Sequence, residues 1–257
     1  MALRFPKQPE VRLRNSPLTE VICQVRFPTI LRIAETQPTE LQERVRQVFP
    51  HLEVEQGMLI GLPRPGSKAA PSAESAPTTY RFLTSDRATT ISLAESFYAL
   101  STAGYQHWDS FAELLTLAHD AVIDVYQPAH ATRIGLRYVN RFTTQNTRTS
   151  NVDEMLSRFQ PDLTALLRAD GWTDPKEMRN RLSLRNEEEQ LTIQTGFGEE
   201  AGERFFILDF DYFEDGELPL EDLVQRCHRY HEVVYDAFRW CVPDETLRVF
   251  GVLDGEP

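Results

Sequence analysis

The feature that most constrains this chain is a segment that occurs twice. Residues 119–126 read His-Asp-Ala-Val-Ile-Asp-Val-Tyr, and residues 231–238 read His-Glu-Val-Val-Tyr-Asp-Ala-Phe. Both follow the pattern His, acid, any, Val, any, Asp, any, aromatic. Each ends an amphipathic helical pattern and is soon followed by a proline, Pro128 or Pro243. Because repeated segments indicate repeated structural units, we expect a fold built from two similar halves.

The overall composition is that of a globular protein with an acidic surface. The 257 residues include 39 acids and 27 Lys or Arg residues, which gives a net charge of −12. Such a charge repels nucleic acid and anionic membranes, and it favours basic partners. No apolar run reaches the length of a membrane span, and residues 1–7 lack the apolar core of a signal peptide. We therefore expect a cytoplasmic protein without membrane contact.

The three cysteines give no sign of a disulfide framework or a metal site. Cys23, Cys227 and Cys241 are scattered and odd in number, and no CxxC pair occurs. Reduced thiols, as in cytoplasmic proteins, are the expectation.

Hydrophobic periodicity predicts strand, helix, three strands and helix in the first half, residues 1–130. The predicted elements lie at 18–27, 38–49, 58–62, 80–84, 90–100 and 109–126, the last with an N-cap at Asp109-Ser110. Residues 63–79 are dense in Pro, Ser, Ala and Gly. That composition predicts a flexible loop.

The second half, residues 131–257, repeats this order of elements. The predicted elements lie at 133–142, 152–169, 178–185, 191–197, 204–213 and 219–242, and a short strand is predicted at 246–251. Pro161 is expected to kink or split the helix at 152–169. Gly196 to Gly202 superficially resembles a phosphate-binding loop, but the glycine spacing and the strand that follows favour a hairpin turn.

These elements predict an α+β fold in which two β-α-β-β-β-α units form one curved antiparallel sheet with helices on one face. We expect the two halves to form one fused globular domain. The element order resembles a duplicated TATA-binding-protein-like or helix-grip fold, which by itself says nothing about function.

Two sequence features resemble a sporadically distributed, largely uncharacterised prokaryotic protein family. They are the opening Pro17-Leu18-Thr19-Glu20-Val21 with Val25-Arg26-Phe27-Pro28, and the His-x-x-Val…Phe pattern of the closing helix. The resemblance implies a bacterial or archaeal origin and no assigned activity.

A series of arginines is the first candidate for a binding surface. Alternate residues of a strand share a face, so Arg133, Arg137 and Arg141 point one way. Three arginines of a later strand are also separated by even numbers of residues and therefore share a face: Arg179, Arg181 and Arg185. One interpretation is a face that binds anions, nucleic acid or an acidic partner. The alternative is charge pairing within the sheet, with Asp209 and Asp211 beside the arginines.

Asp209 and Asp211 also suggest a metal site, because two carboxylates on one strand face can hold Mg²⁺. A three-residue DxD pattern is common by chance, however, and nearby arginines would neutralise it. His228 and His231 have a spacing that can hold Zn²⁺, but no third ligand is visible nearby. His119 and His231 occupy matching positions, which favours hydrogen-bonded histidines that pack helix against sheet.

Three functions follow, and the sequence does not decide among them. The leading hypothesis is a non-enzymatic protein-interaction module with a basic protein partner and no cofactor. The family resemblance adds the expectation that the module is a component of a prokaryotic defence (antiviral) or toxin–antitoxin-like system. The second is anion or nucleic-acid binding through the arginines. The third is a metal-dependent enzyme that uses Asp209 and Asp211. No catalytic motif is visible, which favours a non-enzyme, and the oligomeric state stays open.

Overall fold

The computed structural model describes residues 5–61 and 72–253 and has an α+β fold, as predicted. Nine antiparallel strands form one sheet. In sheet order they are β3 (His51–Gly61), β4 (Ser72–Leu83), β5 (Thr89–Ala94), β6 (Phe97–Thr102), β2 (Leu18–Arg26), β7 (Ala131–Thr143), β10 (Glu203–Leu218), β9 (Glu189–Glu200) and β8 (Met178–Asn186). Two short strands, β1 (Arg12–Leu13) and β11 (Val252–Leu253), pair separately.

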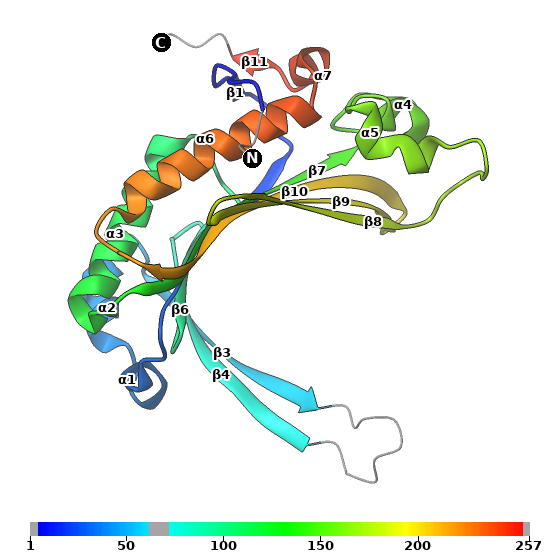
Figure 1. Ribbon diagram of the computed structural model, residues 1–257. Helices are drawn as coiled ribbons and strands as arrows, with labels where there is room; N and C mark the ends of the chain where they lie inside the picture. Colours follow the sequence, from blue (N-terminus) through cyan, green and yellow to red (C-terminus); the bar gives the residue numbers. More distant parts are fainter. Residues whose placement is uncertain (1–4, 62–71, 254–257) are drawn as a thin grey trace.

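The helices gather on one side of a bent sheet. They are α1 (Leu31–Glu35), α2 (Thr39–Val45), α3 (Trp108–Tyr126), α4 (Val152–Leu156), α5 (Pro161–Thr164), α6 (Leu223–Cys241) and α7 (Asp244–Val249), and a 3₁₀ turn, η1, spans Ala165–Arg168. Figure 1 shows α1, α2, α3 and α6 along the outer side of the bend. The inner side, between the β3–β4 hairpin and strands β8 to β10, carries no described helix (Figure 1). We call this side the open face.

The strand order mirrors itself about the junction between β2 and β7. Outward from the junction the order is β2, β6, β5, β4, β3 on one side and β7, β10, β9, β8 on the other. In each half the first strand is central and the last strand lies next to it. The strand β3 has no counterpart among the described strands of the second half. The two-half arrangement fits a duplication, which itself stays a prediction.

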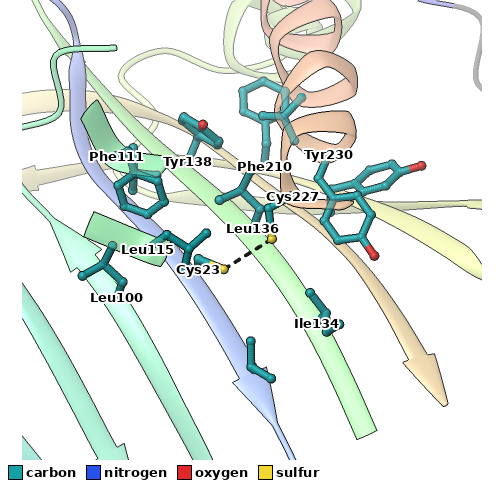
Figure 2. Close-up of a cluster of buried hydrophobic side chains, with 14 of the residues drawn as sticks. Cys23, Leu100, Phe111, Leu115, Ile134, Leu136, Tyr138, Phe210, Cys227 and Tyr230 are labelled. Atoms are coloured by element: carbon teal, nitrogen blue, oxygen red, sulfur yellow. Dashed lines mark hydrogen bonds between the residues drawn. The ribbon is translucent and has the colours of Figure 1, made fainter. Parts of the chain in front are cut away.

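Helices and strands from both halves build the core. Figure 2 shows Cys23 of β2, Leu136 of β7 and Phe210 of β10 beneath Leu115 of α3 and Cys227 of α6. All five residues are fully buried. Burial of an aliphatic or aromatic side chain of this kind contributes about 1.5–3 kcal/mol, so the junction between the halves is a major source of stability.

The cysteines are free thiols, and two of them meet across this junction. The Sγ atoms of Cys23 and Cys227 lie 3.5 Å apart in a hydrogen bond (Figure 2). The contact with Cys23 and burial raise the pKa of the Cys227 thiol well above its ordinary value. Since the thiolate is the reactive form, Cys227 is a packing residue.

Several predicted elements differ from the structure. Residues 90–100 are two strands, β5 and β6, so the first half has four strands after its first helix segment. The helix α3 begins earlier than expected. Its N-cap is His107 rather than Asp109, and the His107 side chain accepts a hydrogen bond from Ser110 N.

The C-terminal segment also differs from the prediction. The sequence predicts a strand at 246–251, yet Asp244–Val249 form α7. Two acids in the first turn of α7, Asp244 and Glu245, favour the helix because they face the positive end of its dipole.

The prediction of a loop at 63–79 is wrong for residues 72–79. Residues 63–71 lie outside the described residues, and residues 72–79 belong to β4. Pro77 is tolerated in this strand because β4 pairs with β5 only over Tyr80 to Leu83, and the pairing with β3 shifts register near Pro77. Proline occurs at such one-sided or irregular positions because it cannot donate a hydrogen bond.

Two predictions about local chain geometry are confirmed. The helix at 152–169 is split at Pro161, which begins α5. The glycine-rich segment is the β9–β10 hairpin, and its two turn residues, Ala201 and Gly202, have φ values of 51° and 82°. Two positive φ values are the mark of a type I′ hairpin turn.

Candidate functional site

The arginines of β7 lie on the open face and are paired with carboxylates. Arg137 forms two hydrogen bonds with Asp209, from Nε at 2.8 Å and from Nη2 at 2.7 Å. Arg133 donates to Asp211 at 2.9 Å, and Arg141 donates to Glu200 at 2.7 Å. The interpretation that these arginines pair within the sheet is therefore confirmed for β7.

Aromatic rings of β10 complete this arrangement. The guanidinium of Arg133 lies 3.5 Å from the centroid of the Phe213 ring, and that of Arg141 lies 4.2 Å from the centroid of Phe205. Cation–π contacts of this kind contribute about 0.5–2 kcal/mol. Because ion pairs and ring faces already occupy these guanidinium groups, the centre of the open face is not a basic surface.

The arginines of β8 lie far from those of β7, although they are on the same face. The strands β9 and β10, with Asp209 and Asp211, separate the two groups, and β8 is an edge of the sheet. Arg179 pairs with Glu177 at 2.9 Å, and both side chains are exposed. Arg181 and Arg185 have no ion-pair partner within the described part of the chain. The six arginines therefore do not form one continuous stripe.

The two aspartates are committed to the sheet. Asp209 is buried and accepts from Arg137 and from Gln194 Nε2 at 3.2 Å. Burial raises the pKa of Asp211, and the neighbouring Arg133 and Arg137 partly offset that rise. In residues 5–61 and 72–253 no cluster of three or more His, Cys, Asp or Glu residues suits a metal ion. The aspartates are thus arranged as acceptors for arginine.

The two repeated histidines have matching contacts. Tyr98 and Tyr138 are buried, and burial raises the pKa of both hydroxyls well above the ordinary value of 10.0. Each hydroxyl contacts a histidine Nδ1 atom, Tyr98 with His119 at 2.6 Å and Tyr138 with His231 at 2.8 Å. Both histidines are buried, so the predicted packing role is confirmed. His228 is exposed and lies beside His231 with a ring separation of 6.4 Å.

One edge of the sheet shows a feature that the sequence interpretation missed. Leu52 and Val54 of β3 are 41% and 52% exposed, although apolar side chains at this position of a sheet are usually covered. On the same strand, Glu53 contacts Arg87 at 2.5 Å and Glu55 contacts Arg81 at 2.6 Å. The alternation His-Leu-Glu-Val-Glu at residues 51–55 was the available signal, because period-two alternation predicts a strand.

The opposite edge has a different character. β8 also carries an exposed apolar side chain, Leu182, which is 52% exposed. The charged residues of β8 are three arginines, which are Arg179, Arg181 and Arg185. The sheet therefore has one apolar and acidic edge, β3, and one basic edge, β8.

Comparison with protein-family models and with curated proteins found no match to this chain. No described helix combines the length and the apolar character needed to cross a membrane. Function is therefore inferred from the two edges and the open face of the sheet.

Proposed function

We propose that the protein is a non-enzymatic interaction module that binds a basic protein partner along the β3 edge. The observation that carries the proposal is the exposed pair Leu52 and Val54 on a strand whose outer side has no partner among the described strands. An unpaired strand edge offers free backbone donors and acceptors to a strand of another protein. Exposed apolar side chains add a favourable contact area at the same place.

The charge around this edge supports a basic partner. Glu53 and Glu55 alternate with the two apolar side chains, and the protein as a whole has a net charge of −12. Their present partners, Arg87 and Arg81, are themselves partly exposed. Exposed ion pairs contribute only about 0–1 kcal/mol, so a lysine or arginine of the partner can replace them at low cost.

The other two hypotheses have weaker support in the geometry. Binding of nucleic acid or another anion would depend on Arg181 and Arg185 of β8, because the arginines of β7 are paired. Metal-dependent catalysis would require Asp209 to leave Arg137. The resemblance to the sporadically distributed prokaryotic family adds the expectation of a role in a defence or toxin–antitoxin-like system, with the basic partner as its other component.

The test is affinity purification from the native host with the wild type and two variants. The first variant, L52K/V54K, replaces the apolar side chains of β3 with like charges for a basic partner. The matched control, L182K, makes the same change at an equally exposed leucine on the β8 edge. We expect a stoichiometric basic protein with the wild type and L182K, reduced at least about tenfold with L52K/V54K.

Three results would contradict the proposal. They are the absence of a stoichiometric protein partner, equal recovery of the partner with L52K/V54K, and RNA or DNA in the eluate that is lost in a further variant, R181A/R185A. The variants change exposed or partly exposed residues, and circular dichroism would verify that they fold.

A further inference from the structure

A cavity on the helix side of the sheet is distinct from the β3 edge. Its volume is about 340 Å³, and it lies between α6, strands β7 and β10, and the segment at residues 10–16. Cavities of a few hundred Å³ with mixed walls are typical of small-molecule sites. The wall combines aliphatic side chains with five aromatic ones, which are Tyr105, Tyr138, Phe210, Tyr235 and Phe238.

Residues 8–14 form one wall of the cavity, and α6 holds them in place. The Tyr235 hydroxyl accepts from Val11 N at 2.9 Å and donates to the Pro9 carbonyl at 3.1 Å. Arg239 also donates to that carbonyl, at 3.0 Å. We call this segment the strap. It contributes three charged residues to the cavity wall, Glu10, Arg12 and Arg14.

A chain of polar groups lies along the cavity. The Tyr138 hydroxyl contacts His231 Nδ1 at 2.8 Å, which leaves Nε2 on the other side of the imidazole ring. That nitrogen faces Glu10 Oε1 at 3.5 Å, and the contact holds the pKa of Glu10 below its ordinary value. The ring of Trp108 stacks on the ring of His231, with the two centroids 5.0 Å apart and the two planes at 11° to each other, and this contact fixes the orientation of the imidazole. Glu10 is therefore ionised and paired with His231.

One polar group of the wall is left without a hydrogen-bond partner. The Tyr105 hydroxyl is buried and has no partner among the described residues. The neighbouring Asn140, in contrast, donates its amide to the Leu208 carbonyl at 3.3 Å. A buried polar group without a partner is unfavourable, so the Tyr105 hydroxyl favours an occupant that can hydrogen-bond.

The charges of the wall favour an anion. Arg12 and Arg14 are exposed on the strap, and no carboxylate in the described part of the chain lies within ion-pair distance of either. Glu10, the one carboxylate of the wall, is already engaged by His231. The wall thus carries an excess of positive charge in a protein whose net charge is −12.

We propose that this cavity binds a small aromatic carboxylate. The aromatic ring of the ligand lies against Tyr105, Phe210 and Phe238, since ring edges and faces attract one another. Its carboxylate meets Arg12 and Arg14, which suit a planar, bidentate anion. The site is independent of the interaction proposed at β3, because the cavity and that edge are formed by different strands.

The test uses 3-phenylpropanoate and its uncharged analogue 3-phenylpropanamide as probes in calorimetric titrations of the full chain. The variant R12Q/R14Q removes the charges of the strap, and R179Q/R181Q removes two exposed arginines from β8 as a matched control. Each charge-assisted hydrogen bond is expected to change affinity by about tenfold or more. We expect the acid to bind the wild type and the control equally and R12Q/R14Q at least about tenfold more weakly.

A second variant, A103W, separates binding in the cavity from binding elsewhere. Ala103 is an exposed residue of the cavity wall, so a tryptophan there blocks the space without changing the core. We expect A103W to abolish binding of both probes, and R12Q/R14Q to leave the weak binding of the amide unchanged within about twofold. Absence of acid binding to the wild type, or unchanged acid affinity in R12Q/R14Q or A103W, would overturn the proposal.

Discussion

The two copies of the repeated segment form the same contact with the sheet but have different surroundings. His119 and His231 each contact a buried tyrosine through Nδ1. Beyond that contact, His119 lies beside Asp120 and the backbone of Leu220 and lines a separate cavity of about 430 Å³. His231 instead faces Glu10 of the strap and lines the cavity proposed as a binding site. The shared contact marks what the scaffold needs in both halves. The difference is the strap, which brings charged side chains to the His231 side alone among the two described surroundings.

The largest change in the free energy of unfolding is expected when the tyrosine hydroxyls are removed. Y98F leaves His119 Nδ1 unpaired at a site where Tyr98 has no solvent exposure, and it should lower the free energy of unfolding by about 1–3 kcal/mol. Y138F should cost less, about 0.5–1.5 kcal/mol, because Tyr138 is 7% exposed, so that water can reach the position of its hydroxyl. Urea denaturation of both variants gives the comparison. Equal losses would mean that the two histidines share the same environment.

The acid sensitivity of the protein should depend on His119. Burial lowers the pKa of His119 from its ordinary value of 6.5, and Asp120 offsets part of that effect. The unfolded chain therefore binds the proton more readily, so stability is full above pH 6.5 and is lost as the pH falls through the folded-state pKa. One proton sets an upper limit of about 1.4 kcal/mol per pH unit on this slope.

The measurement is the free energy of unfolding from pH 8 to pH 5 in the wild type and in H119Q. We expect a shallower slope between pH 6.5 and pH 5 in H119Q. The matched control is H51Q, an exposed histidine of β3, which should keep the slope of the wild type. A slope in H119Q as steep as that of the wild type would show that His119 is not the group responsible.

The smallest change in the free energy of unfolding is expected at Glu10, the residue whose contact distinguishes His231 from His119. The contact with His231 lowers the pKa of Glu10, so its stabilising contribution is present above its ordinary value of about 4.5 and is lost as the pH falls through the lowered pKa. E10Q should cost less than about 1 kcal/mol at pH 7, because the carboxylate is about half exposed. The cost should vanish at low pH. E35Q, at an exposed acid without such a contact, should be neutral throughout.

The sequence predicted the parts of the fold that depend on periodicity and failed where tertiary pairing decides. The alternation of Arg133, Arg137 and Arg141 placed them on one face correctly, and the spacing of Asp209 and Asp211 predicted their role as partners. The pattern at 90–100 could not reveal two strands, because Glu95 and Ser96 carry no strong turn signal. Strand order, which separates β8 from β7, is a property of the whole sheet and is invisible in one strand.

The cavity was not predictable from the sequence, because its wall comes from distant segments. The signal at His231 was its repeat, and this favoured a packing role. Nothing in residues 10–14 indicates that they lie beside residue 231. Hydrogen bonds of Pro9 and Val11 with Tyr235, and of Pro9 with Arg239, bring Glu10 to the histidine. The β3 edge, in contrast, was accessible through the alternation at residues 51–55.

The strap has a consequence for the order in which the chain acquires its structure. Val11 is separated from Tyr235 by 224 residues, and Pro9 from Arg239 by 230 residues. On a ribosome that makes about 5–20 residues per second, residue 11 waits more than ten seconds for its partner. Contacts of such long sequence separation also slow folding in free solution. The wall that carries Arg12 and Arg14 is therefore completed only after α6 has been synthesised, so a nascent chain lacks the cavity until then.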